Sequence, residues 1–182
     1  MKASEAQALL DGADLICSAE EVRIAVARLA QEISAKLKGE FPVVLSVMGG
    51  AAVFTGQLLP QLRFPLEFGA IEVTRYNNDT QGRDISWRLP PRDNVRGRTV
   101  LVVDDILDEG ITLAAIRAKL LQMGASEVYA AVFADKEIGR DKPAHADFIG
   151  VTVPNRYVFG FGMDAYGLWR NLPAIYALKN NQ

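Results

Sequence analysis

The sequence predicts an α/β fold in which helices flank a central, mostly parallel sheet. Apolar segments of strand length alternate with segments of helical periodicity, an order typical of strands joined by crossover helices. One of these segments, residues 100–103, contains only Val and Leu, which is typical of a strand buried on both faces. A length of 182 residues with 49% hydrophobic residues suits a single domain with a sizeable core.

The composition indicates a cytoplasmic enzyme. With 23% charged residues, a net charge of −2 and a pI near 5.5, the chain offers no basic face for nucleic acid and no polybasic patch for a membrane. No apolar run approaches the roughly 18 residues of a membrane span, and no secretory pattern is present. The single cysteine, Cys17, excludes an internal disulfide and suits a reducing compartment. One histidine and one cysteine argue against zinc sites and Ser-His-Asp or Cys-His catalysis.

Two long helices are predicted from apolar periodicity. The first begins at a capping box formed by Ser18 and Glu21 and ends at Gly39. Its buried face should carry Val22, Val26, Leu29, Ile33 and Leu37. The second begins near Thr112 and ends at Gly124. Its buried face should carry Leu113, Ile116, Leu120 and Leu121.

The remaining elements are shorter. Apolar or alternating segments predict strands at residues 43–47, 66–76, 85–89, 100–103, 128–133, 148–153 and 157–161. A short helix should start near Ala51 and stop before Pro60, and residues 168–178 also suggest a helix despite Pro173. The polar, Gly-containing segment 77–83 predicts a loop.

Carboxylates follow the buried strand directly. Asp104 and Asp105 come at its end, and Asp108 lies in a short turn that leads through Gly110 to a helix beginning at Thr112. Ligands of open α/β sheets bind beyond the carboxyl ends of the strands, and the N-terminus of a helix favours phosphate. Carboxylates repel phosphate, so they should contact another part of the ligand, such as the hydroxyls of a ribose. The pattern therefore predicts a site for a sugar phosphate.

Other phosphate motifs fit less well. The chain has no Gly-Lys dipeptide for a Walker A loop, and the turn after the strand has one Gly rather than the three of a dinucleotide-binding loop. The remaining alternative is an ordinary strand-to-helix turn with solvent-exposed acidic residues.

The segment VVDDILDEGIT (residues 102–112) resembles the motif by which type I phosphoribosyltransferases bind phosphoribosyl pyrophosphate (PRPP). The family commonly has Thr and Lys where this chain has Glu109 and Ile111. Residues 15–178 also resemble the purine branch of this family, the hypoxanthine-guanine phosphoribosyltransferases. A second matching block comprises residues 147–150, residues 154–164 and the pair Trp169-Arg170.

This resemblance implies a type I phosphoribosyltransferase fold with a small hood. The whole chain would form one domain, with a core at about 35–150 and a hood from about 1–20 and 151–182. The implied reaction transfers the 5-phosphoribosyl group from PRPP to hypoxanthine or guanine, giving IMP or GMP and pyrophosphate in purine salvage. Mg²⁺ is the implied cofactor, and a homodimer or homotetramer is the implied assembly.

The resemblance assigns the PRPP motif its roles. Asp108 would be the general base that takes the purine proton, and Asp104 and Asp105 would bind the ribose hydroxyls. The 5-phosphate would lie against the segment made of Asp108, Glu109, Gly110, Ile111 and Thr112.

The second block would hold the base. In the family, the residue at Tyr157 stacks on the purine, the main chain at Val158 contacts its edge, and Lys136 donates to the six-position oxygen. Asp164 lies near the two-position and also helps to hold Mg²⁺ through water, while Asp104 and Asp105 complete the implied metal site. Read alone, Tyr157 is equally consistent with a core aromatic and Lys136 with a solvated side chain.

Three further segments complete the implied site. Met48 and Gly49 match the pyrophosphate loop, although the family often has a basic residue at Met48, and we expect a cis peptide between Val47 and Met48. Arg170 would reach the pyrophosphate. Arg75 and Tyr76 would begin a flexible loop over the reaction centre, where the family usually has Ser-Tyr.

Two alternatives stay open. Some proteins of this fold bind PRPP as a signal and regulate nucleic acids rather than catalyse a reaction. A phosphoribosyltransferase could also use another base, such as xanthine, adenine or a pyrimidine, although Lys136 favours a six-oxopurine.

Overall fold

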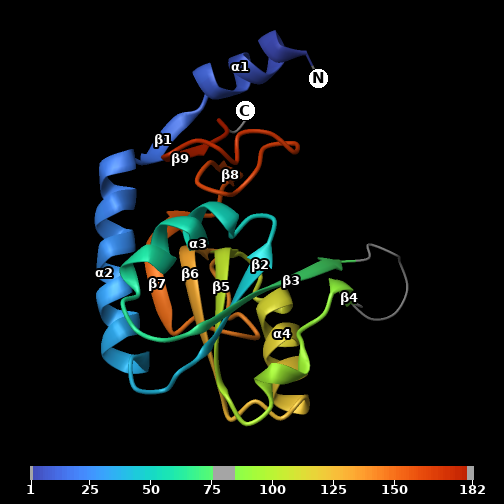
Figure 1. Ribbon diagram of the computed structural model, residues 1–182. Helices are drawn as coiled ribbons and strands as arrows, with labels where there is room; N and C mark the ends of the chain where they lie inside the picture. The colour runs from blue at the N-terminus through green and yellow to red at the C-terminus, as the bar shows by residue number, and fades with distance from the viewer. Residues whose placement is uncertain (1, 76–84, 180–182) are drawn as a thin grey trace.

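The structure is a computed structural model that describes residues 2–75 and 85–179 (Figure 1). The helices are α1 (Ala3–Asp11), α2 (Ala19–Leu37), α3 (Ala52–Leu58) and α4 (Ile111–Gln122), with short 3₁₀ helices η1 (Leu59–Gln61) and η2 (Asp93–Val95). The strands are β1 (Asp14–Cys17), β2 (Val43–Met48), β3 (Glu67–Arg75), β4 (Ile85–Leu89), β5 (Thr99–Leu107), β6 (Glu127–Glu137), β7 (Phe148–Pro154), β8 (Val158–Phe159) and β9 (Ile175–Ala177).

A six-stranded sheet forms the centre of the described part of the chain. Its strand order is β4-β3-β2-β5-β6-β7, and every pair is parallel except β3 with β4. The order departs from the chain order because β5 pairs with β2, which places the acidic motif in the middle of the sheet. The predicted mostly parallel α/β fold is confirmed.

The packing of residues 100–103 explains why this part of β5 is apolar. Leu101 and Val103 pack in the core beneath α2 and α3, whereas Val100 and Val102 pack on the other face with α4. All four are 0% exposed. Because helices cover both faces, neither face of the strand tolerates polar side chains. The predicted doubly buried strand is confirmed.

The capping box that starts α2 is confirmed. The Ser18 hydroxyl accepts a hydrogen bond from the Glu21 N–H (3.3 Å), and the Glu21 carboxylate accepts one from the Ser18 N–H (2.7 Å). The Ser18 hydroxyl also donates to the Glu21 carboxylate (2.7 Å), and this bond, together with the one from the Ser18 N–H, lowers the pKa of the Glu21 carboxyl. The predicted apolar face of α2 is buried throughout. On α4 the prediction was wrong for Leu121, which is 54% exposed because one residue beyond Leu120 the helix has turned about 100° away from the core.

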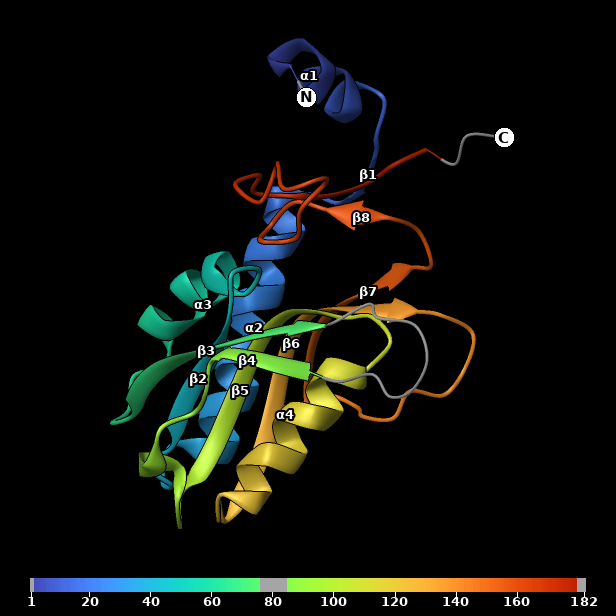
Figure 2. The same ribbon diagram turned by 90° about the vertical axis from the view of Figure 1, so that its right-hand side faces the viewer.

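Segments from both ends of the chain form a second, antiparallel sheet in the order β1-β9-β8. We call this sheet and the loop at residues 160–174 the hood. Figures 1 and 2 show the hood lying across one end of the central sheet. Arg156 ties its strands together by donating to the Asp14 carboxylate (2.6 Å) and the Leu178 carbonyl (2.9 Å).

The helix predicted at residues 168–178 is not formed. Tertiary hydrogen bonds take the backbone instead: Leu172 and Arg170 accept from the N–H groups of Phe161 and Gly162, and β9 pairs with β1 and β8. Trp169 also has a φ of +69°, outside the helical range. Hood pairing therefore overrides a weak helical pattern.

An aromatic cluster fixes the hood on the core. The hood's Phe161 lies 4.4 Å from Phe133 of β6 and 6.4 Å from Phe54 of α3, measured between ring centroids. All three rings are 0% exposed. Aromatic pairs at these distances add roughly 0.5–1.5 kcal/mol beyond the area they bury, so the hood loop is anchored where it faces the strand ends.

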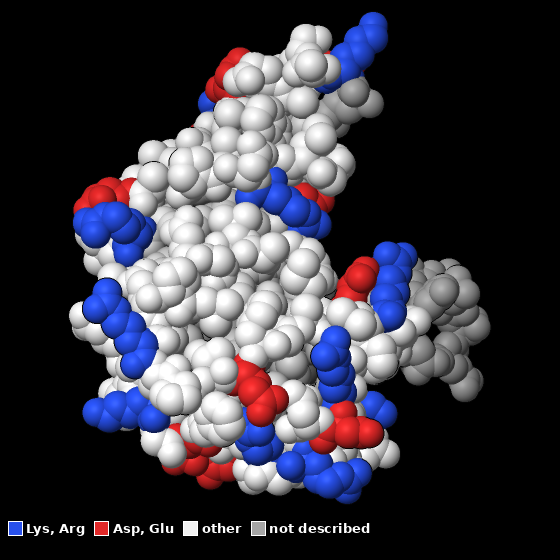
Figure 3. All heavy atoms as spheres, viewed as in Figure 1, with Lys and Arg blue, Asp and Glu red and all other residues white. Residues whose placement is uncertain are grey.

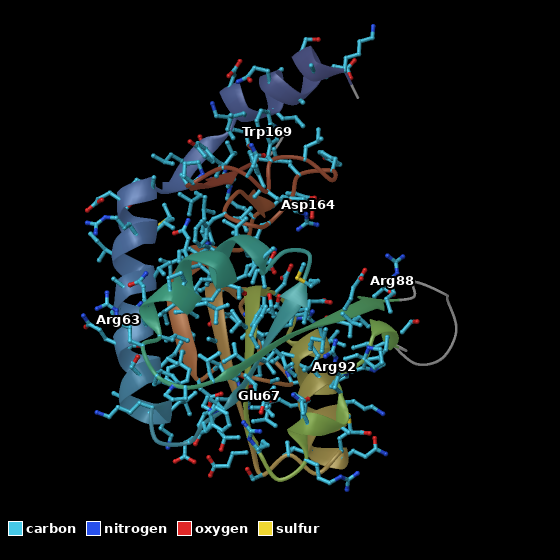
Figure 4. All side chains as sticks on the ribbon, in the orientation of Figure 1. Arg63, Glu67, Arg88, Arg92, Asp164 and Trp169 are labelled. Carbon is cyan, nitrogen blue, oxygen red and sulfur yellow. The ribbon has the colours of Figure 1, made fainter. Side chains whose placement is uncertain are left out.

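The N-terminal helix α1, which was not predicted, has no buried residues. It is joined to the hood by the Trp169 indole, which donates to the Ala6 carbonyl at 3.0 Å, and Figure 4 shows Trp169 beneath α1. Within the described residues, no helix is long and apolar enough to cross a membrane.

Candidate active site

A cavity of about 300 Å³ lies where the carboxyl end of β5 and the loop after β2 face the hood. Figure 4 shows Asp164 extending from the hood loop above this end of the sheet. Of the residues predicted for the sugar, phosphate and pyrophosphate, all but Glu109 and Ile111 line this cavity. The cavity is lined, among others, by Met48, Gly49, Asp104, Asp105, Asp108, Gly110, Thr112, Asp164 and Arg170.

A second cavity of about 250 Å³ adjoins the first. The residues predicted for the base line it: Lys136, Tyr157, Val158 and Asp164. Both cavities share Asp105, Ile106, Asp108 and Asp164 as lining residues. Asp105 and Asp108 would therefore border both a ligand in the first cavity and a ligand in the second.

The turn after β5 is shaped for close approach. Gly110 has a φ of +78° and directly precedes α4, so the N-terminus of that helix opens toward the first cavity. A side chain at Gly110 would meet the Ala144 carbonyl at 3.0 Å and Cβ of Lys142 at 3.1 Å. Glycine is thus required both by conformation and by space. Glu109 lines neither cavity and pairs with Arg140 (2.8 Å) instead.

Asp105 is packed against the loop that follows β2. Its carboxylate accepts from the Ile106 N–H at 2.9 Å, and the Asp104 carboxylate accepts from the Asp105 N–H at 2.9 Å. A Cβ added to Gly50 would lie 1.9 Å from Oδ2 of Asp105, and one added to Gly162 would lie 2.1 Å from the Gly50 carbonyl. Gly50 is therefore packed closely against both the Asp105 carboxylate and the Gly162 backbone.

Burial raises the pKa of the Asp105 carboxyl, and its hydrogen bonds to Asp104 and Ile106 and the positive charge of Arg170 act in the opposite direction. Gly50, the residue after the predicted pyrophosphate residues Met48 and Gly49, also shapes the site, because its missing Cβ leaves room for the Asp105 carboxylate. The adjacent Gly49-Gly50 pair was the available signal.

Lys136 and Asp108 form an ion pair at the shared wall of the cavities. The Lys136 Nζ lies 2.7 Å from Oδ2 of Asp108. The Lys136 side chain is only 12% exposed, so it is not the solvated lysine that remained an alternative.

Arg170 is held at the rim by two hood groups. It donates to the Gly162 carbonyl at 2.7 Å and pairs with the Asp164 carboxylate at 2.6 Å. The other Asp164 oxygen accepts from the Gly167 N–H at 2.7 Å. Both predicted residues therefore face the first cavity as a preformed, charge-balanced pair.

Tyr157 is 46% exposed, which excludes the core-aromatic interpretation. It stacks on Tyr166, with ring centroids 5.8 Å apart and an interplanar angle of 17°. The sequence analysis did not identify Tyr166 as a neighbour of the base site, because nothing in the pattern indicated that the turn brings the two rings together.

The predicted position of the cis peptide was wrong by one bond. The cis bond joins Met48 to Gly49. Val47 and Met48 are still paired in the parallel ladder with Ile71 and Glu72 of β3, so the bond between them belongs to regular strand. The predicted flexible loop is not described: Tyr76 and residues 77–83 lie outside the described residues, as does the side chain of Arg75.

The described residues form an α/β protein with two adjoining cavities at the carboxyl ends of its central strands, where ligands of such folds bind. Comparison with known proteins identifies its family. The profile of the phosphoribosyl transferase domain family matches residues 14–166. The hypoxanthine-guanine phosphoribosyltransferase of Bacillus subtilis is 31% identical over 166 residues, covering 91% of this chain and 92% of the relative. The hypoxanthine-guanine-xanthine phosphoribosyltransferase of Tritrichomonas foetus is 32% identical over 165 residues, covering 89% of each.

Solved structures give the same result. A hypoxanthine phosphoribosyltransferase of Trypanosoma cruzi superimposes with a TM-score of 0.85 at 28% identity, covering 93% of this chain and 97% of that one. A bifunctional TilS/HprT protein of Listeria innocua is also 32% identical over 166 residues, but the chain spans only 26% of its length. The chain therefore belongs to the phosphoribosyltransferase family, among relatives named hypoxanthine-guanine phosphoribosyltransferases.

Proposed function

We propose that this chain transfers the 5-phosphoribosyl group from PRPP to hypoxanthine or guanine, producing IMP or GMP and pyrophosphate in purine salvage. One observation carries the proposal: a cavity lined by carboxylates and a helix N-terminus meets a base-sized cavity lined by Lys136 and Tyr157 at Asp108. The names of the relatives support the same reaction.

In the base cavity, the purine would stack on Tyr157 while Lys136 donates to its six-position oxygen and the Val158 main chain contacts its edge. Asp108 borders this cavity, which suits a general base. The new bond joins a purine ring nitrogen to the anomeric carbon, the bond from that carbon to pyrophosphate breaks, and the proton of the ring nitrogen passes to Asp108.

In the first cavity, Asp104 and Asp105 would accept hydrogen bonds from the ribose hydroxyls. The 5-phosphate would lie against the N–H groups of residues 108–112 at the start of α4, with the Thr112 hydroxyl as a further donor. Carboxylates close to the anomeric carbon also stabilise the positive charge that develops there when pyrophosphate leaves.

The pyrophosphate would lie between the loop of Met48 and Gly49 and the guanidinium of Arg170, which border one cavity. Met48 has no charge, so main-chain N–H groups would bind this end of the ligand. Arg170 already has a hydrogen-bonded position at the rim, and a guanidinium fork matches phosphate oxygens.

The donors of the first cavity fit Mg²⁺, which prefers oxygen ligands and keeps several waters and substrate phosphates in its shell. Asp104, Asp105 and Asp164 line this cavity, and both Asp164 oxygens have other partners, Arg170 and the Gly167 N–H, which suits contact through water. Among the described residues, no His, Cys, Asp and Glu side chains group into a ready-made cage. When bound with PRPP, the ion would neutralise the leaving pyrophosphate.

The same proposal covers the organisation of the chain. The chain would act as one domain, with a core at about 35–150 and hood segments at about 1–20 and 151–182. Arg75 and Tyr76 would begin a loop that excludes water from the reaction. The enzyme would work in the cytoplasm as a homodimer or homotetramer, with no nucleic-acid or membrane partner.

A PRPP-binding regulator of nucleic acid is less well supported. Such a regulator would not need a complete cavity for a purine, but it would need a basic surface on which nucleic acid could bind. Figure 3 shows Lys and Arg side chains interspersed with Asp and Glu on the face in view, rather than one continuous basic area.

A panel of bases tests the proposed function. Hypoxanthine, guanine, xanthine, adenine and a pyrimidine are each incubated with the protein, PRPP and Mg²⁺, and nucleotide formation is followed by absorbance. We expect IMP and GMP, and the xanthine arm decides how far the base range extends. Product from adenine or a pyrimidine alone would assign another branch of the family, and no product with PRPP binding intact would favour the regulator.

A further inference from the structure

Lys142, in the loop between β6 and β7, is a buried lysine with a complete set of partners. Its side chain is 8% exposed. The Nζ donates to the Leu107 carbonyl at 2.8 Å, the Lys136 carbonyl at 2.7 Å and the Asp135 carboxylate at 2.5 Å. An ammonium has three N–H donors, so each donor has one acceptor. An exposed lysine on a loop would not be ordered in this way.

The two carbonyls belong to the ends of different strands that carry the reacting groups. Leu107 is the last residue of β5 and directly precedes Asp108. Lys136 is the next-to-last residue of β6 and supplies the ammonium that pairs with Asp108. The Lys142 ammonium thus joins the backbone that carries the proposed general base, Asp108, to the backbone that carries the proposed purine donor, Lys136.

The aliphatic part of Lys142 has a separate contact. Its Cβ lies where a side chain at Gly110 would come within 3.1 Å, so the loop packs directly against the turn of the PRPP motif. This contact depends on Cβ and not on the ammonium. A substitution that keeps the aliphatic stem and removes only the ammonium therefore tests the hydrogen bonds without disturbing the packing against Gly110.

Resting on the proposed function, we propose that Lys142 is a positioning residue that holds Asp108 and Lys136 side by side against the purine. It touches neither substrate. Its ammonium ties the end of β5 to the end of β6, so that the general base Asp108 and the six-oxygen donor Lys136 keep one spacing relative to each other when they meet the flat ring. The pyrophosphate loop after β2 and Arg170 of the hood are not among its contacts.

The test compares Lys142→Met with wild type in the full chain. Met keeps a stem of similar length and removes the three N–H donors. A displacement of about 1 Å can cost 10²-fold in rate, so kcat for IMP formation should fall roughly ten- to hundred-fold. The Kd for PRPP with Mg²⁺, measured without purine, should stay within roughly threefold, because Met keeps the Cβ that packs against the Gly110 turn of the PRPP motif. Equal losses in kcat and PRPP affinity would overturn the proposal.

A second variant separates positioning from stability, since Lys142→Met leaves the Asp135 carboxylate without its ammonium. In Lys142→Met with Asp135→Asn, that unpaired charge is gone. We expect the thermal midpoint to recover while kcat stays low, because both carbonyls still lack their donor. Recovery of kcat together with the midpoint would show that Lys142 only stabilises the fold.

Lys119→Met is the control for loss of a lysine, because Lys119 lies in the last turn of α4, at the opposite end of the helix from the turn of the PRPP motif. Its kcat and PRPP affinity should equal those of the wild type, and a loss matching that of Lys142→Met would remove the assignment. Wild-type protein that forms no nucleotide in the same assay would instead refute the proposed function.

Discussion

The Lys136 ammonium and the Asp108 carboxylate lie 2.7 Å apart. The two side chains come from adjacent parallel strands, β6 and β5, at their carboxyl ends. Because an ammonium has three donors, Lys136 can keep Asp108 and still donate to a purine oxygen. In the proposed function, a bound purine would add a third partner to this pair, and the pair would keep the general base Asp108 and the donor Lys136 at a fixed spacing.

Asp108→Asn should reduce kcat while leaving PRPP binding nearly intact. Asn has the shape of Asp and still offers an oxygen to Lys136, but it cannot take the purine proton. Loss of a general base lowers rates by about 10²–10⁴. Steady-state kinetics with hypoxanthine and a PRPP titration give the two quantities. Full turnover in the purified variant would remove Asp108 from its role.

Adenine should be a very poor substrate. It carries an amino group where hypoxanthine carries an oxygen, so a donor would face the Lys136 donor. Sites built to hydrogen-bond a substrate group reject the mismatch by about 10⁴–10⁵. The ratio of kcat/KM for hypoxanthine and adenine measures the effect. Comparable values would mean that Lys136 remains on Asp108 throughout and does not select the base.

Much of the core follows from sequence periodicity, the acidic turn after β5 from a local motif, and most other candidate site positions from the family resemblance. Capping chemistry places the start of α2, and a doubly buried strand followed by acidic residues places the motif at the sheet end. These features depend on neighbours along the chain. The sequence analysis erred where distant pairing decides: the hood strand β9 replaces a predicted helix, because its hydrogen-bond partners come from β1 and β8.

Other contributions to the site leave no sequence signal. In the sequence, Lys142 looks like an ordinary loop lysine. Only the fold brings the ends of β5 and β6 close enough for its ammonium to hydrogen-bond to both. Tyr166 meets Tyr157 only through the turn of the hood loop. The cis bond lies one position later than predicted, because β2 pairs with β3 one residue further than its apolar run indicates.

Gly50→Ala should weaken PRPP binding. The new Cβ would lie 1.9 Å from Oδ2 of Asp105, so the carboxylate that faces the ribose must move. Gly39→Ala is a matched control, since nothing lies within 4 Å of a Cβ there. Calorimetric titration with PRPP and Mg²⁺ should show a ten-fold or larger loss for Gly50→Ala, corresponding to about 1.4 kcal/mol, and none for Gly39→Ala. Equal PRPP affinities in the two variants would show that moving Asp105 does not matter for binding and that its carboxylate does not hydrogen-bond to the ribose.

Arg170 should contribute far more to PRPP affinity than Met48 does. Met48 is 39% exposed and uncharged, so its side chain cannot neutralise pyrophosphate, and its loop would bind through main-chain N–H groups. Arg170 holds a fixed position through Gly162 and Asp164, and hydrogen bonds to charged groups contribute about 1.5–3 kcal/mol.

We therefore expect Met48→Ala to keep PRPP affinity within a few-fold and Arg170→Ala to weaken it ten-fold or more, as measured by PRPP titration with Mg²⁺. Thermal midpoints of both variants are the control for the contacts that Arg170 makes inside the hood. If both variants lost stability and neither lost PRPP affinity selectively, the two residues would serve packing alone. A larger loss for Met48→Ala would put the pyrophosphate against the β2 loop and away from the hood, because only the Met48 side chain would then be in contact with it.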